Sequence, residues 1–339
     1  MSHLHIYRRE EISSLIQIRP GETKLGEKIH MFSEFDWKNQ LQIDKARYVL
    51  LGIPEDMGVR ANAGIGGTDS LWNYALKAIL NVQETPELTG EDIMLLGYFN
   101  FSSWIDATAD VDIDTLRAYV SQIDENVFPV VQTIIEAGKI PIIIGGGHNN
   151  AYPLLKAASL ALNKPVNCIN LDAHSDYRVM EGRHSGNGFR YAKMENYLQR
   201  YAIVGLHKNY NSHTVLQDLS ADTNIHYSFY EDIFIERRLS FQEAVDKAIA
   251  FTLGNHIGVE LDIDAIAGAL ASAATPCGVS TIEARQYLYT CAQKANPIYL
   301  HLTEGAISLN DGREDFSTAK LVSYLVTDFI RASRAKNRF

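Results

Sequence analysis

Short apolar runs alternate along this chain with longer segments in which apolar residues recur every three or four positions. Residues 140–144 (IPIII) are continuously apolar, as strands buried on both faces of a sheet usually are. Residues 113–137 instead repeat apolar side chains at helical spacing. Alternation of this kind predicts a doubly wound α/β fold with a largely parallel sheet.

The same two patterns place the other elements. The predicted strands are residues 46–53, 93–98, 140–144, 166–171, 201–206, 225–227, 256–263 and 297–302, and the main predicted helices are residues 113–137, 151–162, 241–253, 280–295 and 318–332. The chain has no linker-like stretch and no internal repeat. We therefore expect a single α/β domain over residues 1–339, with an arm or first helix at residues 1–45 and a basic, solvated tail at residues 333–339.

Composition narrows the class of protein. The chain has 339 residues, 46% hydrophobic and 21% charged, which is typical of a globular protein with a large core. Its formal net charge of -10 argues against a nucleic-acid partner, because nucleic-acid binders usually carry a basic face. The charged N-terminus does not resemble a signal peptide, and no apolar run is long enough to cross a membrane. We expect a cytoplasmic protein with no membrane partner, in which Cys168, Cys277 and Cys291 are reduced packing residues.

Histidines and acidic residues gather directly after several of the predicted strands. Ligands of parallel sheets bind beyond the carboxyl ends of the strands, and residues two apart in an extended segment point the same way. Side chains in these places can therefore converge on one point. They are His148 after residues 140–147, Asp172, His174 and Asp176 after residues 166–171, Asp262 and Asp264 at the end of residues 256–264, and Glu304 after residues 297–303.

Taken singly, each of these residues has an ordinary structural explanation. An aspartate after a strand is usually a helix cap, and a lone histidine is usually a satisfied core residue. Two histidines and four aspartates in three such blocks are harder to explain in that way. This oxygen-rich set suits two Mn²⁺ ions better than structural zinc. If the ions lie roughly 3.5 Å apart, a water that bridges them would lose a proton near neutral pH and become a nucleophile, so the pattern indicates metal-assisted hydrolysis.

Three blocks of this sequence resemble the metal-binding signatures of the ureohydrolases, the arginase/agmatinase/formimidoylglutamase family. They are GGGHN (145–149), DAHSD (172–176) and ELDIDA (260–265), and GIPEDMGVRANAG (52–64) is similar to the first loop of the family. The likeness covers roughly residues 46–305. It implies a three-layer α/β/α fold with a mostly parallel sheet of about eight strands, a binuclear manganese centre and a homo-oligomer. One departure is Ile266-Ala267-Gly268, where the family usually has Leu-Asp-Pro.

The resemblance also implies how the ligands are shared between two manganese ions per chain. Asp172 and Asp262 would bridge the ions. Glu304 resembles a late glutamate of the family that meets the positively charged amidino or imino group of the substrate, for which a carboxylate offers charge-assisted hydrogen bonds. The implied sets are His148, Asp172, Asp176 and Asp262 for one ion, and Asp172, His174, Asp262 and Asp264 for the other.

Two positions bear on the substrate. Arginases and agmatinases carry a proton-transferring histidine in the loop after the second metal block, and the segment GRHSGNGFRYA aligns Ser185 with that position, as in formimidoylglutamases. Arg178, two residues beyond Asp176, resembles an arginine of formimidoylglutamases and offers a bidentate fork for a substrate carboxylate. Two alternatives stay open: Arg178 can form a structural salt bridge, and His184 can transfer protons if the loop is shifted by one residue. The expected substrate contacts are Arg178, Ser185, Asn187 and Glu304, and the expected catalytic residues are Glu304 and His184.

The resemblance therefore implies a manganese-dependent hydrolase of C–N bonds in linear amidines, with a small molecule as its partner. The expected reaction is hydrolysis of N-formimidoyl-L-glutamate to L-glutamate and formamide, a step of histidine degradation. One alternative is a ureohydrolase that releases urea from arginine, agmatine or a guanidino acid. An alternative of another class is a catalytically silent member of the family that binds metal.

Overall fold

The computed structural model describes residues 3–33 and 36–336 of the chain. Its strands are β1 (Leu4–Ile6), β2 (His30–Met31), β3 (Tyr48–Gly52), β4 (Ile93–Phe99), β5 (Ile140–Ile144), β6 (Val166–Leu171), β7 (Leu198–Leu206), β8 (Ile225–Phe229), β9 (Ile257–Asp262) and β10 (Pro297–Thr303). Its helices are α1 (Arg9–Ser13), α2 (Leu25–Lys28), α3 (Trp37–Ile43), α4 (Met57–Ala61), α5 (Leu71–Leu80), α6 (Ser102–Ala107), α7 (Ile113–Glu136), α8 (Ala151–Leu162), α9 (Gly188–Met194), α10 (His213–Ala221), α11 (Phe241–Thr252), α12 (Thr281–Lys294) and α13 (Ser317–Lys336).

The strands form one sheet, ten-stranded over the described residues, in the order β1-β4-β3-β5-β10-β9-β6-β7-β8, with β2 beside β4. Strands β3 to β10 all run parallel to one another, as the resemblance implied. The two further strands come from the N-terminal segment. Strand β1 pairs antiparallel with β4, so part of the N-terminal segment expected as an arm or first helix adds a short strand to the sheet. At three residues, β1 is too short to show a pattern of its own.

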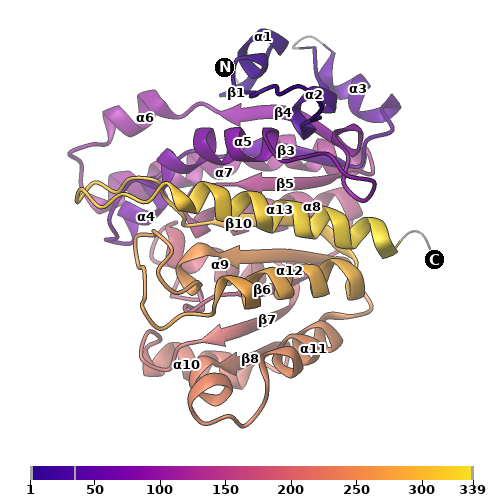
Figure 1. Ribbon diagram of the computed structural model, residues 1–339. Coiled ribbons are helices and arrows are strands. Elements are labelled where there is room, and N and C mark those ends of the chain that lie inside the picture. Colours follow the sequence, from indigo (N-terminus) through magenta and orange to yellow (C-terminus); the bar gives the residue numbers. More distant parts are fainter. Residues whose placement is uncertain (1–2, 34–35, 337–339) are drawn as a thin grey trace.

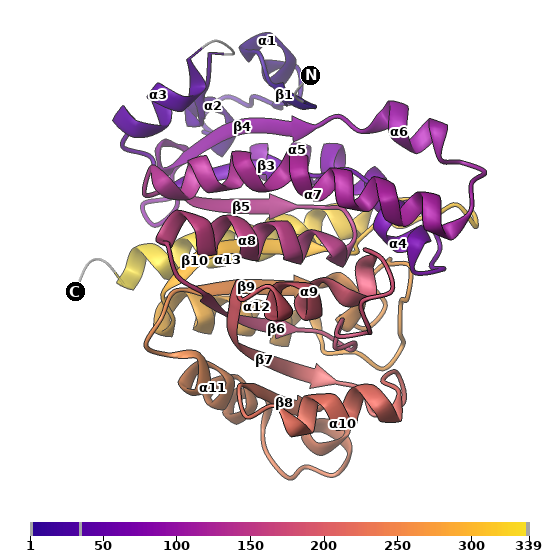
Figure 2. The same ribbon diagram turned by 180° about the vertical axis from the view of Figure 1, so that it is seen from behind.

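Helices cover both faces of the sheet and complete the three predicted layers. Helices α5, α11, α12 and α13 lie on the face seen in Figure 1, and α7, α8, α9 and α10 lie on the face seen in Figure 2. Two buried apolar clusters fill the spaces between the layers, one on each side of the sheet. The parallel strands are therefore buried on both sides, which is why residues 140–144 read as a continuous apolar run.

Local signals explain where several helices begin. The side chain of Asp112 accepts a hydrogen bond from the backbone N–H of Thr115 at the start of α7. At the start of α12, Ser280 and Glu283 cap each other's backbone N–H groups in a capping box. At the C-terminus, α13 continues to Lys336, so the predicted tail at residues 333–339 begins inside a helix; residues 337–339 lie outside the described range.

The register of four neighbouring strands brings their carboxyl ends to one level. Leu302 of β10 pairs with Ile144 of β5 and with Leu261 of β9, and Leu261 also pairs with Leu171 of β6. Residues that follow these strands must therefore meet at the centre of one edge of the sheet. This edge is where parallel α/β sheets bind ligands.

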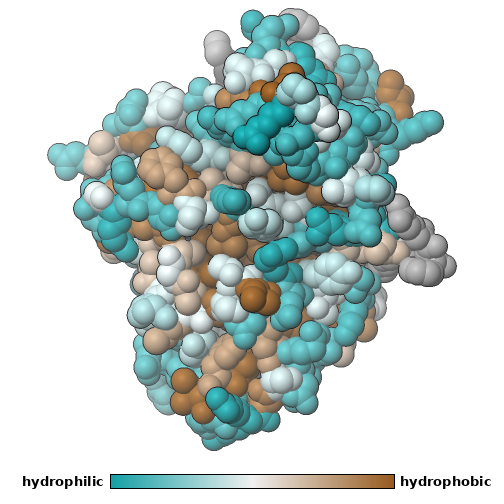
Figure 3. Space-filling model, in the orientation of Figure 1, coloured by the Kyte–Doolittle hydropathy of each residue, from teal (hydrophilic) through white to brown (hydrophobic). Residues whose placement is uncertain are grey.

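On the face seen in Figure 3, hydrophilic residues predominate and smaller hydrophobic patches lie between them. Ile282 of α12 is one of the exposed apolar side chains. Among the described residues, no helix combines the length and the apolar character needed to span a membrane.

Candidate metal centre

The structure brings the six predicted ligand residues together at the carboxyl ends of β5, β6 and β9. The first cluster has His148 at its centre. Its Nδ1 lies 3.2 Å from an oxygen of Asp172, 2.8 Å from one of Asp176 and 3.1 Å from one of Asp262. His148 is fully buried, and so is the Asp172 carboxylate. These four side chains match the first ligand set that the sequence implies.

The second cluster lies beside the first and shares Asp172 with it. Nδ1 of His174 lies 3.1 Å from an oxygen of Asp264 and 3.7 Å from the second oxygen of Asp172. The backbone N–H groups of His174 and Asp264 donate to Asp172 and Asp262 at 2.6 and 2.7 Å. These short turns hold each aspartate in place directly after its strand.

The charges at this edge fit a divalent cation. Nδ1 of His148 can carry at most one proton, yet three carboxylate oxygens lie within 3.2 Å of it. Oδ1 of Asp264 is buried and makes no hydrogen bond with any described residue. A cation would satisfy these crowded oxygens, and a set of carboxylates and imidazoles suits Mn²⁺.

Burial and crowding also separate the pKa values of these acids. Burial, reinforced by the neighbouring Asp172 carboxylate, raises the pKa of Asp176 to about 6. Burial acts in the same direction on Asp172, but hydrogen bonds from His148 and His174 outweigh it and lower the pKa of Asp172 to about 2. In this arrangement, at neutral pH, the buried aspartates repel one another unless a cation lies between them.

Glu304 lies at the same edge, after β10. Its Oε1 accepts a 2.8 Å hydrogen bond from the backbone N–H of His148. Burial, followed by repulsion from Asp264 and Asp176, raises the pKa of Glu304 to about 8 despite that hydrogen bond. Both Glu304 and Asp176 have a positive φ, of 62° and 45°, a conformation that side chains other than glycine adopt at an energetic cost and that is common at functional sites.

A cavity of about 540 Å³ opens over these residues. This volume lies within the usual range for small-molecule sites. Arg178 and Ser185 line the cavity together with His174, Asp176, Asp262, Asp264 and Glu304. The structure therefore places Arg178, Ser185, Glu304 and four of the six metal-ligand candidates around one space.

Arg178 already has partners in this structure. Its Nη2 lies 2.8 Å from Oε1 of Glu181, and its Nη1 donates to Oδ1 of Asn62 at 3.0 Å. The guanidinium is half exposed, with 52% of the side chain accessible. The salt bridge that the sequence left open is present, and Arg178 also lines the cavity.

His184 and Asn187 do not line the cavity. Nδ1 of His184 accepts from the backbone N–H of Gly186, and its Nε2 lies 3.2 Å from Glu181. The Asn187 amide donates to the backbone oxygen of Gly182 and accepts from Arg183. Both side chains are buried, and neither lines the cavity. Their roles in proton transfer and substrate binding stay predictions, which this geometry does not favour.

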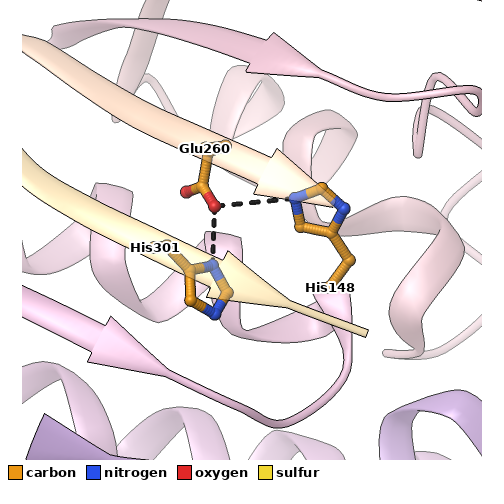
Figure 4. Close-up of side chains that lie close together, drawn as sticks. All are labelled: His148, Glu260 and His301. Atoms are coloured by element: carbon orange, nitrogen blue, oxygen red, sulfur yellow. Dashed lines mark hydrogen bonds and ion pairs between the residues drawn. The ribbon is translucent and has the colours of Figure 1, made fainter. Parts of the chain in front are cut away.

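The structure adds two residues that sequence reasoning passed over, Glu260 and His301. Oε2 of Glu260 lies 2.6 Å from Nδ1 of His301 and 3.5 Å from Nε2 of His148 (Figure 4). Burial would raise the pKa of Glu260, but the imidazoles of His301 and His148 outweigh it and lower the pKa to about 2. The signal in the sequence was an acidic residue two positions before Asp262, on the same face of a buried strand.

Comparison with known proteins agrees with this geometry. A family model, that of the arginase family, matches residues 46–330. A formimidoylglutamase of Corynebacterium efficiens is 32% identical over 143 residues, 42% of this chain and 44% of that protein. One of Streptococcus pyogenes serotype M3 (strain MGAS315) is 23% identical over 233 residues, 66% of each chain. These matches thus span about half to two thirds of the relatives' length.

A crystal structure of Trypanosoma cruzi formiminoglutamase with Mn²⁺₂ superimposes with a TM-score of 0.72. It covers 93% of this chain and 99% of that one, at 19% sequence identity. At this identity, the likeness establishes the fold.

Proposed function

The chain belongs to the arginase family, and on this premise we propose that it hydrolyses a C–N bond of N-formimidoyl-L-glutamate. Water would add to the imino carbon, the bond from that carbon to the glutamate nitrogen would break, and formamide and L-glutamate would leave. One observation carries the proposal: six histidine and aspartate side chains form two adjoining clusters, and four of them line one cavity together with Glu304 and Arg178.

The proposed cofactor is a pair of Mn²⁺ ions. His148, Asp176 and the shared Asp172 and Asp262 would hold one ion, and His174, Asp264 and the same shared pair would hold the other. Bound there, the ions would supply a nucleophile by lowering the pKa of a water molecule. The crowded carboxylate oxygens around Nδ1 of His148 and the unpaired Oδ1 of Asp264 support this assignment.

Glu304 would hold the reacting group of the substrate. An amidine is a planar cation when protonated, and a carboxylate can accept two hydrogen bonds from it. The backbone N–H of His148 fixes one oxygen of Glu304, so the carboxylate has a defined direction before substrate arrives. Burial raises the pKa of Glu304 and so favours its protonated form in the free protein. A cationic substrate bound beside Glu304 would lower that pKa again and favour the charged carboxylate.

Arg178 and Ser185 would bind the glutamate part of the substrate. Arg178 lines the cavity and its side chain is half exposed, so the N–H groups not engaged by Glu181 and Asn62 could meet a carboxylate. A bound carboxylate would have to compete with Glu181 for part of this fork.

The contact with Glu181 also favours a second candidate, a ureohydrolase acting on agmatine or another guanidino compound without a carboxylate. Such a substrate would leave the pair of Arg178 and Glu181 undisturbed. The metal centre and Glu304 would serve both reactions equally well, since a guanidinium is also a planar cation.

A product assay separates these candidates. Manganese-loaded protein is incubated with formimidoylglutamate, arginine, agmatine and guanidinobutyrate side by side, and formamide, glutamate and urea are quantified. We expect formimidoylglutamate to be hydrolysed fastest. Faster release of urea from agmatine would favour the second candidate, and faster release from arginine or guanidinobutyrate would indicate a ureohydrolase for a substrate that carries a carboxylate. No turnover of any substrate by protein that holds two ions would indicate a catalytically silent member of the family.

A further inference from the structure

A buried carboxylate lies directly behind the histidine at the centre of the first cluster. Glu260 of β9 is paired in register with His301 of β10, and all three side chains in Figure 4 are fully buried. The proposed metal ligands do not include Glu260 or His301. An ionisable side chain in the interior of a sheet is costly to bury, so its contacts need an explanation.

Two neighbours hold the Glu260 carboxylate in one orientation. The hydroxyl of Tyr299 donates to Oε1 at 2.7 Å, and Nδ1 of His301 lies 2.6 Å from Oε2. Tyr299 reaches this position because it packs over Gly258, where a Cβ atom would come within 2.4 Å of the tyrosine ring. Each carboxylate oxygen thus has a fixed partner on the adjacent strand.

The carboxylate, held in this way, faces His148 from behind. Oε2 of Glu260 lies 3.5 Å from Nε2 of His148, and no described residue makes a closer hydrogen bond to that nitrogen. The other nitrogen of the ring, Nδ1, faces Asp172, Asp176 and Asp262. His148 is therefore placed between an anion behind it and the acidic cluster in front of it.

When a cation lies among the three carboxylates in front of Nδ1, that side no longer attracts a proton, and the anion behind the ring favours a proton on Nε2. A neutral imidazole has one N–H and one lone pair, and an anion beside Nε2 stabilises the form with the proton there. The lone pair then lies on Nδ1, where a metal ion can use it. At 3.5 Å the contact is longer than a normal hydrogen bond, so its effect is chiefly electrostatic.

We propose that Glu260, held by His301 and Tyr299, is a positioning residue that keeps Nδ1 of His148 as the metal-facing nitrogen. The inference rests on the proposed two-manganese centre. It adds that one of the two ions depends on this carboxylate, because Glu260 contacts His148 and does not contact His174 or Asp264. Carboxylates behind a ligating histidine commonly contribute 10–100-fold to metal affinity.

Manganese titration of metal-free protein tests this inference. In Glu260→Gln the side chain keeps its size and loses its charge. We expect one of the two ions to bind about 10–100-fold more weakly, while affinity for the other stays unchanged. Thermal unfolding of the metal-free forms, measured in parallel, shows whether the variant is folded.

Two tyrosine variants provide a matched pair. Tyr299→Phe removes a hydroxyl that fixes the Glu260 carboxylate. We therefore expect it to lower the affinity for the same ion that Glu260→Gln affects, but by a smaller factor. Tyr287→Phe removes an equally buried hydroxyl that donates to the backbone oxygens of Ile169 and Glu260 and not to the Glu260 carboxylate, so it should leave both affinities unchanged. A purely structural role for these hydroxyls would make the two variants behave alike.

Provided that the wild type binds two ions, two results for Glu260→Gln would overturn the inference. They are unchanged affinity for both ions and an equal loss of affinity for both. Equal effects of Tyr299→Phe and Tyr287→Phe would overturn it as well. Wild-type protein that fails to bind two ions would refute the metal centre itself, and the inference with it.

Discussion

Replacement of Arg178 probes the choice of substrate. In the free protein this guanidinium makes an ion pair with Glu181 and a hydrogen bond with Asn62. Its side chain is 52% exposed, and exposed ion pairs contribute about 0 to 1 kcal/mol to stability. Arg178→Ala should therefore change the free energy of unfolding by no more than about 1 kcal/mol.

The expected effect on catalysis is larger. Loss of a charge-assisted contact with a substrate carboxylate costs about 1.5 to 3 kcal/mol, or roughly tenfold to a hundredfold in kcat/KM. Arg178→Lys keeps the charge but loses the planar fork, so it should already lower kcat/KM for formimidoylglutamate. Manganese content should stay the same in both variants. Glu181→Gln is the matched control: it removes the competing carboxylate and should not weaken turnover.

The assay compares two substrates in each variant, formimidoylglutamate and an amidine without a carboxylate that the enzyme accepts. Only the first has the group that Arg178 is proposed to hold, so only its kcat/KM should fall strongly. If Arg178→Ala lowers kcat/KM equally for both substrates and also lowers thermal stability, Arg178 serves only as the partner of Glu181. The argument for a glutamate-derived substrate would then depend on Ser185 alone.

Three further predictions concern single residues. Asp172→Ala should reduce manganese content by at least one ion per chain in elemental analysis, because this carboxylate faces both clusters; a single zinc ion retained by wild type and variant would contradict the binuclear centre. Glu304→Gln should lower kcat/KM about tenfold or more with manganese content unchanged, since the amide keeps the hydrogen bond from His148 and loses the charge; unchanged kinetics would remove Glu304 from the site. Burial lowers the pKa of His184 to about 4. As the pH falls from about 6.5, the unfolded chain therefore binds a proton that the folded chain does not, and the free energy of unfolding decreases. The asparagine of His184→Asn does not titrate. Between pH 7 and pH 5, the free energy of unfolding of the metal-free variant, measured with urea, should therefore fall by about 1 to 2 kcal/mol less than that of the wild type. Equal decreases would contradict the buried, neutral His184.

The central layers of the fold could be predicted from the sequence because their patterns are strong. Strands β5 and β6 and helix α8 have the predicted bounds, since a continuous apolar run marks β5, a mostly apolar run marks β6 and regular helical spacing marks α8. Short elements at the edge of the sheet carry too few residues for a period to show. Strand β1 owes its conformation to its pairing with β4, a tertiary contact that no local pattern encodes.

The metal-ligand candidates could be predicted because ligands at one sheet edge must follow strands, and their spacing is local. The orientation of neighbouring side chains could not be predicted. His184 and Ser185 are adjacent in sequence, yet only Ser185 lines the cavity, because Gly186 and Glu181 hold the His184 ring elsewhere. Glu260 was missed because its partners, His301 and Tyr299, lie on another strand about forty residues away.

The central claim is that two manganese ions lie between the ligand clusters after β5, β6 and β9. An anomalous difference map, recorded at the manganese absorption edge from crystals of manganese-loaded protein, tests this claim most directly. We predict two peaks per chain, one beside Nδ1 of His148 and one beside Nδ1 of His174, with Asp172 next to both. A single peak, or peaks away from these side chains, would contradict the binuclear centre and the hydrolysis proposed from it.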